Sequence, residues 1–260
     1  MFIAYFSPLF IWSTVFIFGL IIGSFLNCLI WRLHKKETLG GRSYCPHCRQ
    51  TIAWHDNLPV LSFIFLRGRC RTCRAKISWQ YPLVELATAI LFLLTWQMNS
   101  VQPDFYLLLA RDWLLIVTLI VVFVYDWRWQ LIPLTVVWPL GIAIFILNLL
   151  LGFFWLDVLF FAVAAAGFFW LQYLITRRKG LGEGDIWLGA FLGLSFPGTA
   201  DLLLIMVLSY SLGAIVGLTL ISRQRKKWQS QIALGPFLAL GAVITLIWGE
   251  RLIAWYLGFF

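Results

Sequence analysis

The sequence predicts an all-α integral membrane protein of about eight transmembrane helices with a small cytosolic zinc-binding loop domain. Of its 260 residues, 62% are hydrophobic and 12% are charged, whereas a soluble domain is about half apolar and about a quarter charged. The apolar residues form long runs, and most reach the ~20 residues that a helix needs to cross hydrocarbon. The one long polar segment contains two pairs of cysteines.

The apolar runs and the polar segment divide the chain into three expected parts. The first apolar run, 9–31, is expected to be a retained first transmembrane helix (domain 1–31), because no basic residue precedes it and no small-residue cleavage site accompanies it. The polar segment 32–80 is the expected loop domain, and 81–260 is the expected seven-helix membrane domain. Its apolar runs are 82–98, 106–125, 131–151, 155–176, 186–196, 202–222 and 233–260. The run 186–196 is short, and the last is interrupted by Gly235-Pro236 and Glu250.

The basic residues predict the topology. The formal net charge is +9, and ten of the twenty Lys and Arg residues lie between Arg32 and Lys76. With eight spans, the loops 32–80, 126–130, 177–185 and 223–232 are all basic, whereas the intervening connections have no Lys or Arg. Since cytoplasmic loops are enriched in Lys and Arg, these four loops are expected in the cytosol. This distribution indicates topology and contact with anionic lipid rather than nucleic-acid binding.

The four paired cysteines predict a metal site. Cys45-Pro46-His47-Cys48 and Cys70-Arg71-Thr72-Cys73 are two C-x2-C motifs separated by 21 residues. Each motif supplies two sulfurs from one turn, and two such turns complete a tetrahedral zinc site. Two disulfides are the alternative, which a cytosolic loop disfavours. Such closed sites are usually structural.

Two aspartates are the candidate catalytic residues. Asp126 follows the third run, and Asp185 ends the tetrapeptide Gly182-Glu183-Gly184-Asp185 before the sixth. Ionisable residues at the edge of a membrane segment are costly and are therefore functional candidates. Both are expected at the cytosolic face, where a close pair of carboxyl groups shares a proton and activates water. The alternatives are an ion pair between Asp126 and Arg128, and a helix-capping role for Asp185.

Several sequence blocks, in this order, resemble the type IV prepilin peptidases, a family of bifunctional bacterial leader peptidases and N-methyltransferases. The resemblance covers nearly the whole chain. The blocks are Gly23-Ser24-Phe25-Leu26-Asn27, Trp31-Arg32-Leu33, Cys45-Pro46-His47-Cys48, Trp54-His55-Asp56-Asn57-Leu58-Pro59, Gly68-Arg69-Cys70-Arg71-Thr72-Cys73, Tyr81-Pro82-Leu83-Val84-Glu85-Leu86, Asp126 with Ile132-Pro133, Gly182-Glu183-Gly184-Asp185, and Gly235-Pro236-Phe237-Leu238-Ala239-Leu240-Gly241.

The resemblance implies an aspartic endopeptidase of the bacterial inner membrane that uses Asp126 and Asp185. Its substrates would be type IV prepilins or pseudopilins, whose basic leader is cut at the cytosolic face. It also implies methylation of the new N-terminal residue with S-adenosylmethionine, an activity that accompanies the cysteine loop in this family. No glycine-rich nucleotide-binding fingerprint is present, so the sequence assigns no residues to the methyl donor.

The chain departs from the family pattern at two positions near the aspartates. Leu134 stands where relatives usually have a second acidic residue, and Trp187 stands where relatives often have lysine. Neither change removes a residue assigned to hydrolysis. Glu85, at the start of the second span, is expected either to face the site or the methyl donor, or to be an interfacial carboxylate held by a basic side chain.

Three alternatives to the bifunctional enzyme remain at this point. The first is a peptidase without methyltransferase activity. The second is a proton- or cation-coupled transporter, although transport sites usually lie near the midplane between inverted repeats, which the sequence lacks. The third is a loop that docks pilus or secretion assembly machinery, which leaves the aspartates without a role.

Overall fold

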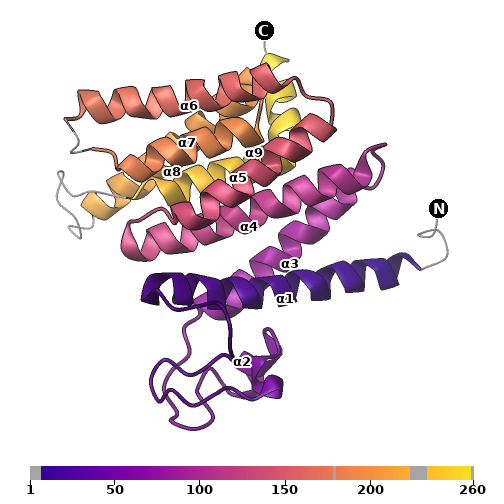
Figure 1. The fold of residues 1–260 in the computed structure, drawn as a ribbon, viewed down its shortest axis with the longest axis vertical. Coiled ribbons are helices and arrows are strands. Elements are labelled where there is room, and N and C mark those ends of the chain that lie inside the picture. The colour runs from indigo at the N-terminus through magenta and orange to yellow at the C-terminus, as the bar shows by residue number, and fades with distance from the viewer. Residues whose placement is uncertain (1–6, 178–179, 223–232, 259–260) are drawn as a thin grey trace. The chain divides into compact units, whose positions relative to one another are not determined.

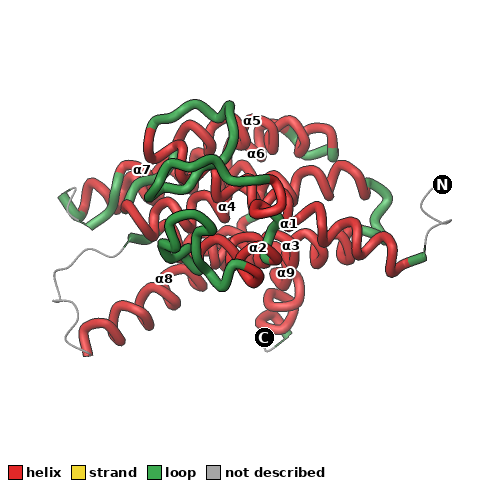
Figure 2. The backbone as a smooth tube through the Cα atoms, turned by 90° about the horizontal axis from the view of Figure 1, so that it is seen from below, coloured by secondary structure: helices red, strands yellow, loops and turns green. Residues whose placement is uncertain are grey.

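The computed structural model describes residues 7–177, 180–222 and 233–258, and this part of the chain consists of helices and loops without a strand (Figure 2). The helices in the described ranges are α1 (Pro8–Lys35), η2 (Trp54–Asn57), α2 (Leu61–Phe65), α3 (Gln80–Asn99), α4 (Phe105–Trp129), α5 (Leu134–Leu150), α6 (Trp155–Ile175), α7 (Glu183–Ser195), α8 (Thr199–Ser222) and α9 (Gly235–Leu257).

The chain divides into two compact units, Met1–Ser100 and Val101–Phe260. In the first unit, α1 and α3 pack along each other (Figure 1). A Cβ atom on Gly23 would lie 2.6 Å from the Cα of Glu85, so only glycine permits this approach of the two backbones. Close packing through small residues is how membrane helices associate.

The loop between α1 and α3 contains the cysteines and is held by the end of α1. Arg32 is buried, and its guanidinium donates hydrogen bonds to the carbonyl oxygens of five consecutive residues, 38–42. Lys36 ends α1 in the left-handed conformation, with φ 54°. A buried charge is tolerated only where hydrogen bonds replace its hydration. Arg32 therefore fixes the direction in which the chain leaves the helix.

In the second unit, α4 to α9 enclose one apolar core, with buried residues from all six helices. α7 lies against α6, where a Cβ on Gly193 would be 2.3 Å from the carbonyl oxygen of Phe161. α4 packs on both α5 and α9. In Figure 1 the end of α4 and the beginnings of α5 and α7 lie on the same side of this unit.

Among the described residues, six helices are long and apolar enough to cross a membrane: α1, α3, α4, α6, α8 and α9. The other two predicted spans are also helical but shorter, with 17 residues in α5 and 13 in α7. The prediction of a multi-pass helical membrane protein is therefore confirmed, whereas the count of eight spans stays a prediction.

Two helix boundaries differ from the predicted ones. α7 begins at Glu183, so Asp185 lies inside this helix and not before it. α9 begins at Gly235, two residues after the expected start of the last run, with Gly235 and Pro236 in its first turn and Glu250 within the helix. Proline fits the first turn because the N–H that it lacks has no helical partner there. The basic residues at 178–179 and 223–227, whose loops were predicted to lie in the cytosol, are outside the described residues, as are the chain ends 1–6 and 259–260.

Candidate active site and metal centre

Asp126 lies in the last turn of α4, and only 5% of its surface is exposed. Gln130, the residue after α4, caps the end of the helix with a left-handed φ of 54°. Its N–H donates to the carbonyl oxygen of Asp126 at 2.9 Å. A left-handed residue of this kind is a common helix terminator. The carboxyl group is therefore presented at the start of the short connection to α5.

Asp185 is the third residue of α7 and is 8% exposed. Its Oδ2 accepts a hydrogen bond from the N–H of Gly182 at 3.0 Å, which satisfies one of the free donors at the helix start. Asp185 thus has the capping role that the sequence analysis set beside catalysis. The bond uses one carboxylate oxygen, and the other oxygen can serve a second partner.

Three helix ends meet around Ile132, and this brings the two aspartates together. A Cβ on Gly184 would lie 2.6 Å from Ile132 Cγ1, and a Cβ on Gly235 would lie 3.0 Å from Ile132 Cδ1. The Cβ on Gly235 would also lie 2.5 Å from Asp126 Oδ2. The carboxyl groups of Asp126 and Asp185 are close enough for their charges to interact. The two acids therefore lie at helix ends that share Ile132 as a neighbour.

The alternative ion pair of Asp126 is not formed within the described part of the chain. The guanidinium of Arg128 instead lies over the ring of Trp129, 5.5 Å from its centroid. At the second departure from the family pattern, the ring of Trp187 packs on that of Trp138 at 5.1 Å between centroids. This contact joins α5 to α7.

Tyr173 and Tyr210 lie near the start of α7, and neither was predicted from the sequence as a site residue. The hydroxyl of Tyr173 donates to Glu183 Oε1 at 2.7 Å, and that of Tyr210 donates to Gln172 Oε1 at 2.6 Å. These contacts connect α6 to α7 and to α8. The partners are 10 and 38 residues apart, so no local pattern in the sequence indicates them.

The four cysteines of the loop come together as predicted. One sulfur atom from each of Cys45, Cys48, Cys70 and Cys73 lies within 4.8 Å of the other three, and the Cys45 and Cys73 sulfurs are 3.8 Å apart. All four are free thiols, so the structure does not support the disulfide alternative. With Zn–S distances of about 2.3 Å, tetrahedral geometry requires sulfurs roughly 3.8 Å apart. The donor set and its spacing therefore fit zinc.

The two cysteine turns are built in the same way. The N–H of Cys45 donates to Gln50 O and that of Cys70 donates to Ala75 O, both at 2.9 Å. Arg49 and Arg74 follow the second cysteine of each turn with left-handed φ angles of 57° and 60°. The repeated geometry explains how each C-x2-C motif directs two sulfurs toward one point.

The electrostatics of the cluster favour a cation. The N–H of Cys73 is the main cause that lowers the pKa of Cys70, to about 7. At Cys73 the N–H of Ala75 lowers the pKa, but burial and the neighbouring sulfurs outweigh it and raise the pKa to about 11. Thiols in one cluster resist simultaneous ionisation, and a bound metal ion removes this conflict by stabilising all the thiolates.

Two further carboxylates organise this loop. Asp56 accepts two hydrogen bonds from Arg71, at 2.7 and 2.6 Å, and this pairing holds its pKa below the usual range. Glu85 is buried and accepts a hydrogen bond from the N–H of Val60 at 2.7 Å. Val60 has a φ of 61°, which is rare for a β-branched residue. Glu85 thus joins α3 to a strained backbone turn, where the sequence analysis considered a basic partner.

Comparison with known proteins places this arrangement in a family. The model of the bacterial peptidase A24 N-terminal domain matches residues 17–98, and that of the type IV leader peptidase family matches residues 113–218. A prepilin leader peptidase/N-methyltransferase of Aeromonas hydrophila is 35% identical, over 96% of this chain and 95% of the relative. The chain belongs to the type IV leader peptidase family.

Two further relatives are also similar to this chain over more than nine tenths of its length. The proteins of the same name from Legionella pneumophila and Pseudomonas aeruginosa are 32% and 33% identical, over 97% and 93% of this chain and 96% and 91% of the relatives. No solved structure matches the chain. The leader peptidase model spans both aspartates, and the N-terminal domain model spans all four cysteines.

Proposed function

We propose that this protein is a prepilin leader peptidase and N-methyltransferase of the bacterial inner membrane. The observation that carries the proposal is the convergence of two buried aspartates, Asp126 and Asp185, at adjoining helix ends. Relatives that carry this name align along more than nine tenths of the chain. The substrates would be type IV prepilins or pseudopilins, which have a basic leader.

The proposed hydrolysis uses the two aspartates as one unit. The ionised member takes a proton from a water molecule, and the resulting hydroxide attacks the scissile carbonyl carbon. The protonated member donates its proton to the carbonyl oxygen, which gives a gem-diol intermediate. The first aspartate then passes the proton taken from water to the amide nitrogen, the C–N bond breaks and the amine leaves. One hydroxyl of the intermediate returns its proton to the second aspartate, so that the carboxylic acid product forms and the pair is restored. Gly184 and Gly235 let the starts of α7 and α9 approach Ile132 and Asp126 closely, which holds both acids at one place.

The membrane arrangement belongs to the same proposal. We infer that α5 and α7 also enter the membrane, so that eight helices form the bundle. The basic segment 32–80 would then lie in the cytosol, and the ends of α4 and α7 that carry Asp126 and Asp185 would face it. In this scheme 1–31 is the first span, 32–80 is the zinc domain associated with methylation, and 81–260 is the peptidase domain.

The methyltransferase activity would use S-adenosylmethionine, which supplies an electrophilic methyl group to the new N-terminal amine. Zinc bound to Cys45, Cys48, Cys70 and Cys73 would be structural, because four thiolates complete the coordination and leave no position for a substrate. Its role would be to fold a segment that is too small to form an apolar core.

The test uses purified full-length protein in detergent with a prepilin, and mass spectrometry of the products with and without S-adenosylmethionine. The wild type should release the leader in both conditions and add one methyl group only with the donor. Asp126→Asn and Asp185→Asn should lower cleavage by at least about 1,000-fold. The matched control is Asp157→Asn, at an exposed aspartate in the first turn of α6, which should cleave normally.

The possible outcomes separate the alternatives. Normal cleavage by either asparagine variant would exclude the aspartate pair. Cleavage without any added methyl mass would leave a peptidase alone. Proton-coupled uptake into liposomes that is lost in the same two variants, without prepilin cleavage by the wild type, would favour a transporter.

A further inference from the structure

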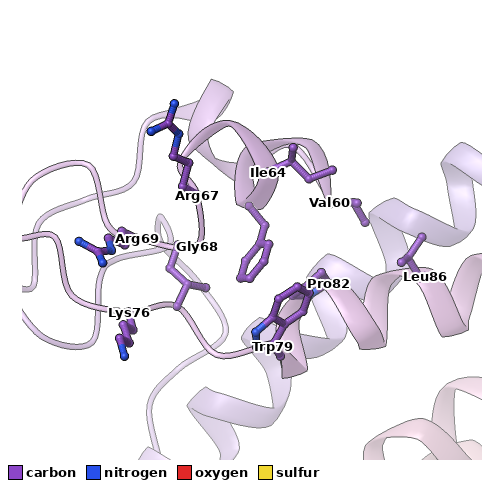
Figure 3. Close-up of a pocket in the computed structure, with 11 residues that line it drawn as sticks. Val60, Ile64, Arg67, Gly68, Arg69, Lys76, Trp79, Pro82 and Leu86 are labelled. Carbon is purple, nitrogen blue, oxygen red and sulfur yellow. The ribbon is translucent and has the colours of Figure 1, made fainter.

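A pocket of about 850 Å³ opens in the first unit, beside the cysteine turns and outside the aspartate site. Its walls come from α2, from the segments that flank the second cysteine turn and from the first two turns of α3. In Figure 3 Arg69 and Lys76 lie at one side of the pocket and Leu86 of α3 lies at the other. The pocket therefore has a charged side and a side formed by a helix of membrane-spanning length.

The interior of the pocket is apolar. The rings of Phe63 and Trp79 meet at 4.8 Å between centroids, and Pro82 and Leu86 extend the apolar wall along α3. Gly68, with φ 64°, brings the chain onto the Phe63 ring, where a Cβ would be 3.1 Å from Cζ. This wall has the shape and chemistry to contact a hydrocarbon chain.

The charged side is formed by Arg67, Arg69 and Lys76, and none of the pocket-lining residues is acidic. Arg69 and Lys76 face each other across an isolated antiparallel bridge. Like charges directly opposite each other destabilise such a pair. Within the described ranges, none of the three cations has a carboxylate at ion-pair distance. An anion placed between them would relieve this repulsion.

The surface around the pocket is also apolar and uncovered in the first unit. Ile64, Phe65, Trp79 and Leu83 are 60–79% exposed. Exposed apolar groups that cluster in this way mark interaction surfaces. Trp79 directly precedes α3, at the depth where a spanning helix meets the lipid headgroups and where tryptophan is enriched.

We propose that this pocket binds an anionic phospholipid. The phosphate group lies between Arg69 and Lys76, with Arg67 nearby, and an acyl chain follows Phe63 and Trp79 toward Leu86. Continuity with the exposed apolar surface of α3 at Leu83 supports a lipid over a soluble anion. The basic rim disfavours both a basic leader peptide and the sulfonium cation of S-adenosylmethionine.

The test is photocrosslinking of the full-length protein in detergent. Phosphatidylglycerol and phosphatidylcholine, each with a diazirine on one acyl chain, are irradiated with the protein, and the labelled peptides are identified by mass spectrometry. Phosphatidylglycerol should label residues 63–86 at least about 5-fold more than phosphatidylcholine, since each basic group near a membrane surface favours anionic lipid by about that factor. Equal labelling by the two lipids would overturn the proposal.

Two double variants with the same loss of charge locate the site. R69Q/K76Q removes the facing cations and should lower the labelling of this segment by phosphatidylglycerol roughly 10-fold or more. R49Q/R74Q changes the arginines that follow each cysteine turn, which do not line the pocket, and should label as the wild type does. Equal loss in both would indicate a diffuse effect of loop charge and contradict the site.

Two further measurements test whether the variants keep their metal and whether the methyl donor uses the same pocket. Zinc content is measured for each variant, and K76Q alone replaces the double variant if the latter loses its metal. K76Q should reduce labelling about 5-fold, and unchanged labelling would contradict the proposal. Protection of residues 63–86 by S-adenosylmethionine would assign the pocket to the methyl donor and overturn the lipid assignment.

Discussion

At the residue scale, Gly235 determines how closely α9 approaches Asp126. Gly235→Ala would place a methyl group 2.5 Å from Asp126 Oδ2, so either the carboxylate or the helix start must shift. Because a displacement of about 1 Å near reacting groups costs roughly 100-fold in rate, we expect a loss of that order in prepilin cleavage. Steady-state cleavage measurements test this.

Gly167→Ala is the matched control for this substitution. Gly167 lies within α6, and a Cβ there would have no neighbour within 4 Å. Alanine should therefore leave cleavage unchanged and stabilise the helix slightly, by up to about 1 kcal/mol. If both variants cleave at the wild-type rate, close packing of α9 on Asp126 is not needed for activity.

Arg32 is the second residue with a specific expected effect. Lysine has one nitrogen and cannot bond five carbonyl oxygens at once, so Arg32→Lys should remove most of the hydrogen bonds that hold residues 38–42 against the end of α1. We expect a loss of about 2–3 kcal/mol in the free energy of unfolding. A thermal shift in detergent measures it. Arg42→Lys, at an exposed arginine with one hydrogen bond, should cause little change, and equal shifts would contradict the role of Arg32.

At the element scale, the two cysteine turns should hold one zinc ion together. Elemental analysis of the purified protein should give about one zinc per chain, and Cys45→Ser should lower this ratio to near zero, because a structural site requires four ligands. Cys28→Ser is the control, since Cys28 lies in α1 outside the cluster. Full zinc occupancy in the Cys45 variant would exclude a four-thiolate site.

Apolar runs predicted the existence of every long helix but not the exact start of each. α7 begins at Glu183 because Gly182 and Asp185 close its first turn, whereas the apolar run begins only at Ile186. Gly235 and Pro236 suggested a break, yet they start α9, because a helix start has no need for the proline N–H. The positions of these helix ends depend on local capping interactions, which a hydropathy pattern does not reveal.

The candidate site was predictable in its reactive groups but not in its surroundings. The four cysteines stand in two motifs whose spacing indicates a metal site, whereas the two aspartates were proposed from their place at the edges of apolar runs and from the family resemblance. Ile132 contacts Gly184 and Gly235, and Tyr210 contacts Gln172, only because the helices pack in this order. Such contacts join residues distant in sequence, and a single sequence contains no periodic pattern that indicates them.

At the scale of the whole molecule, the two groups of functional residues lie in different units. The cysteines belong to Met1–Ser100 and the aspartates to Val101–Phe260. We therefore expect Cys70→Ser combined with Cys73→Ser to abolish N-methylation while cleavage stays within about twofold of the wild type, as for independent sites. Product mass spectrometry reports both activities in one sample. A parallel loss of both would show that the zinc loop also supports the peptidase.

The short length of α7 has a consequence for how water reaches the aspartates. Thirteen residues extend about 20 Å at 1.5 Å per residue, against a hydrocarbon thickness of about 30 Å. In the proposed arrangement, in which α7 enters the membrane, this mismatch would be met by local thinning of the lipid next to the helix. Thinner lipid at the start of α7 would let water reach Asp185. Hydrolysis could then take place deeper than the lipid headgroups of the surrounding membrane.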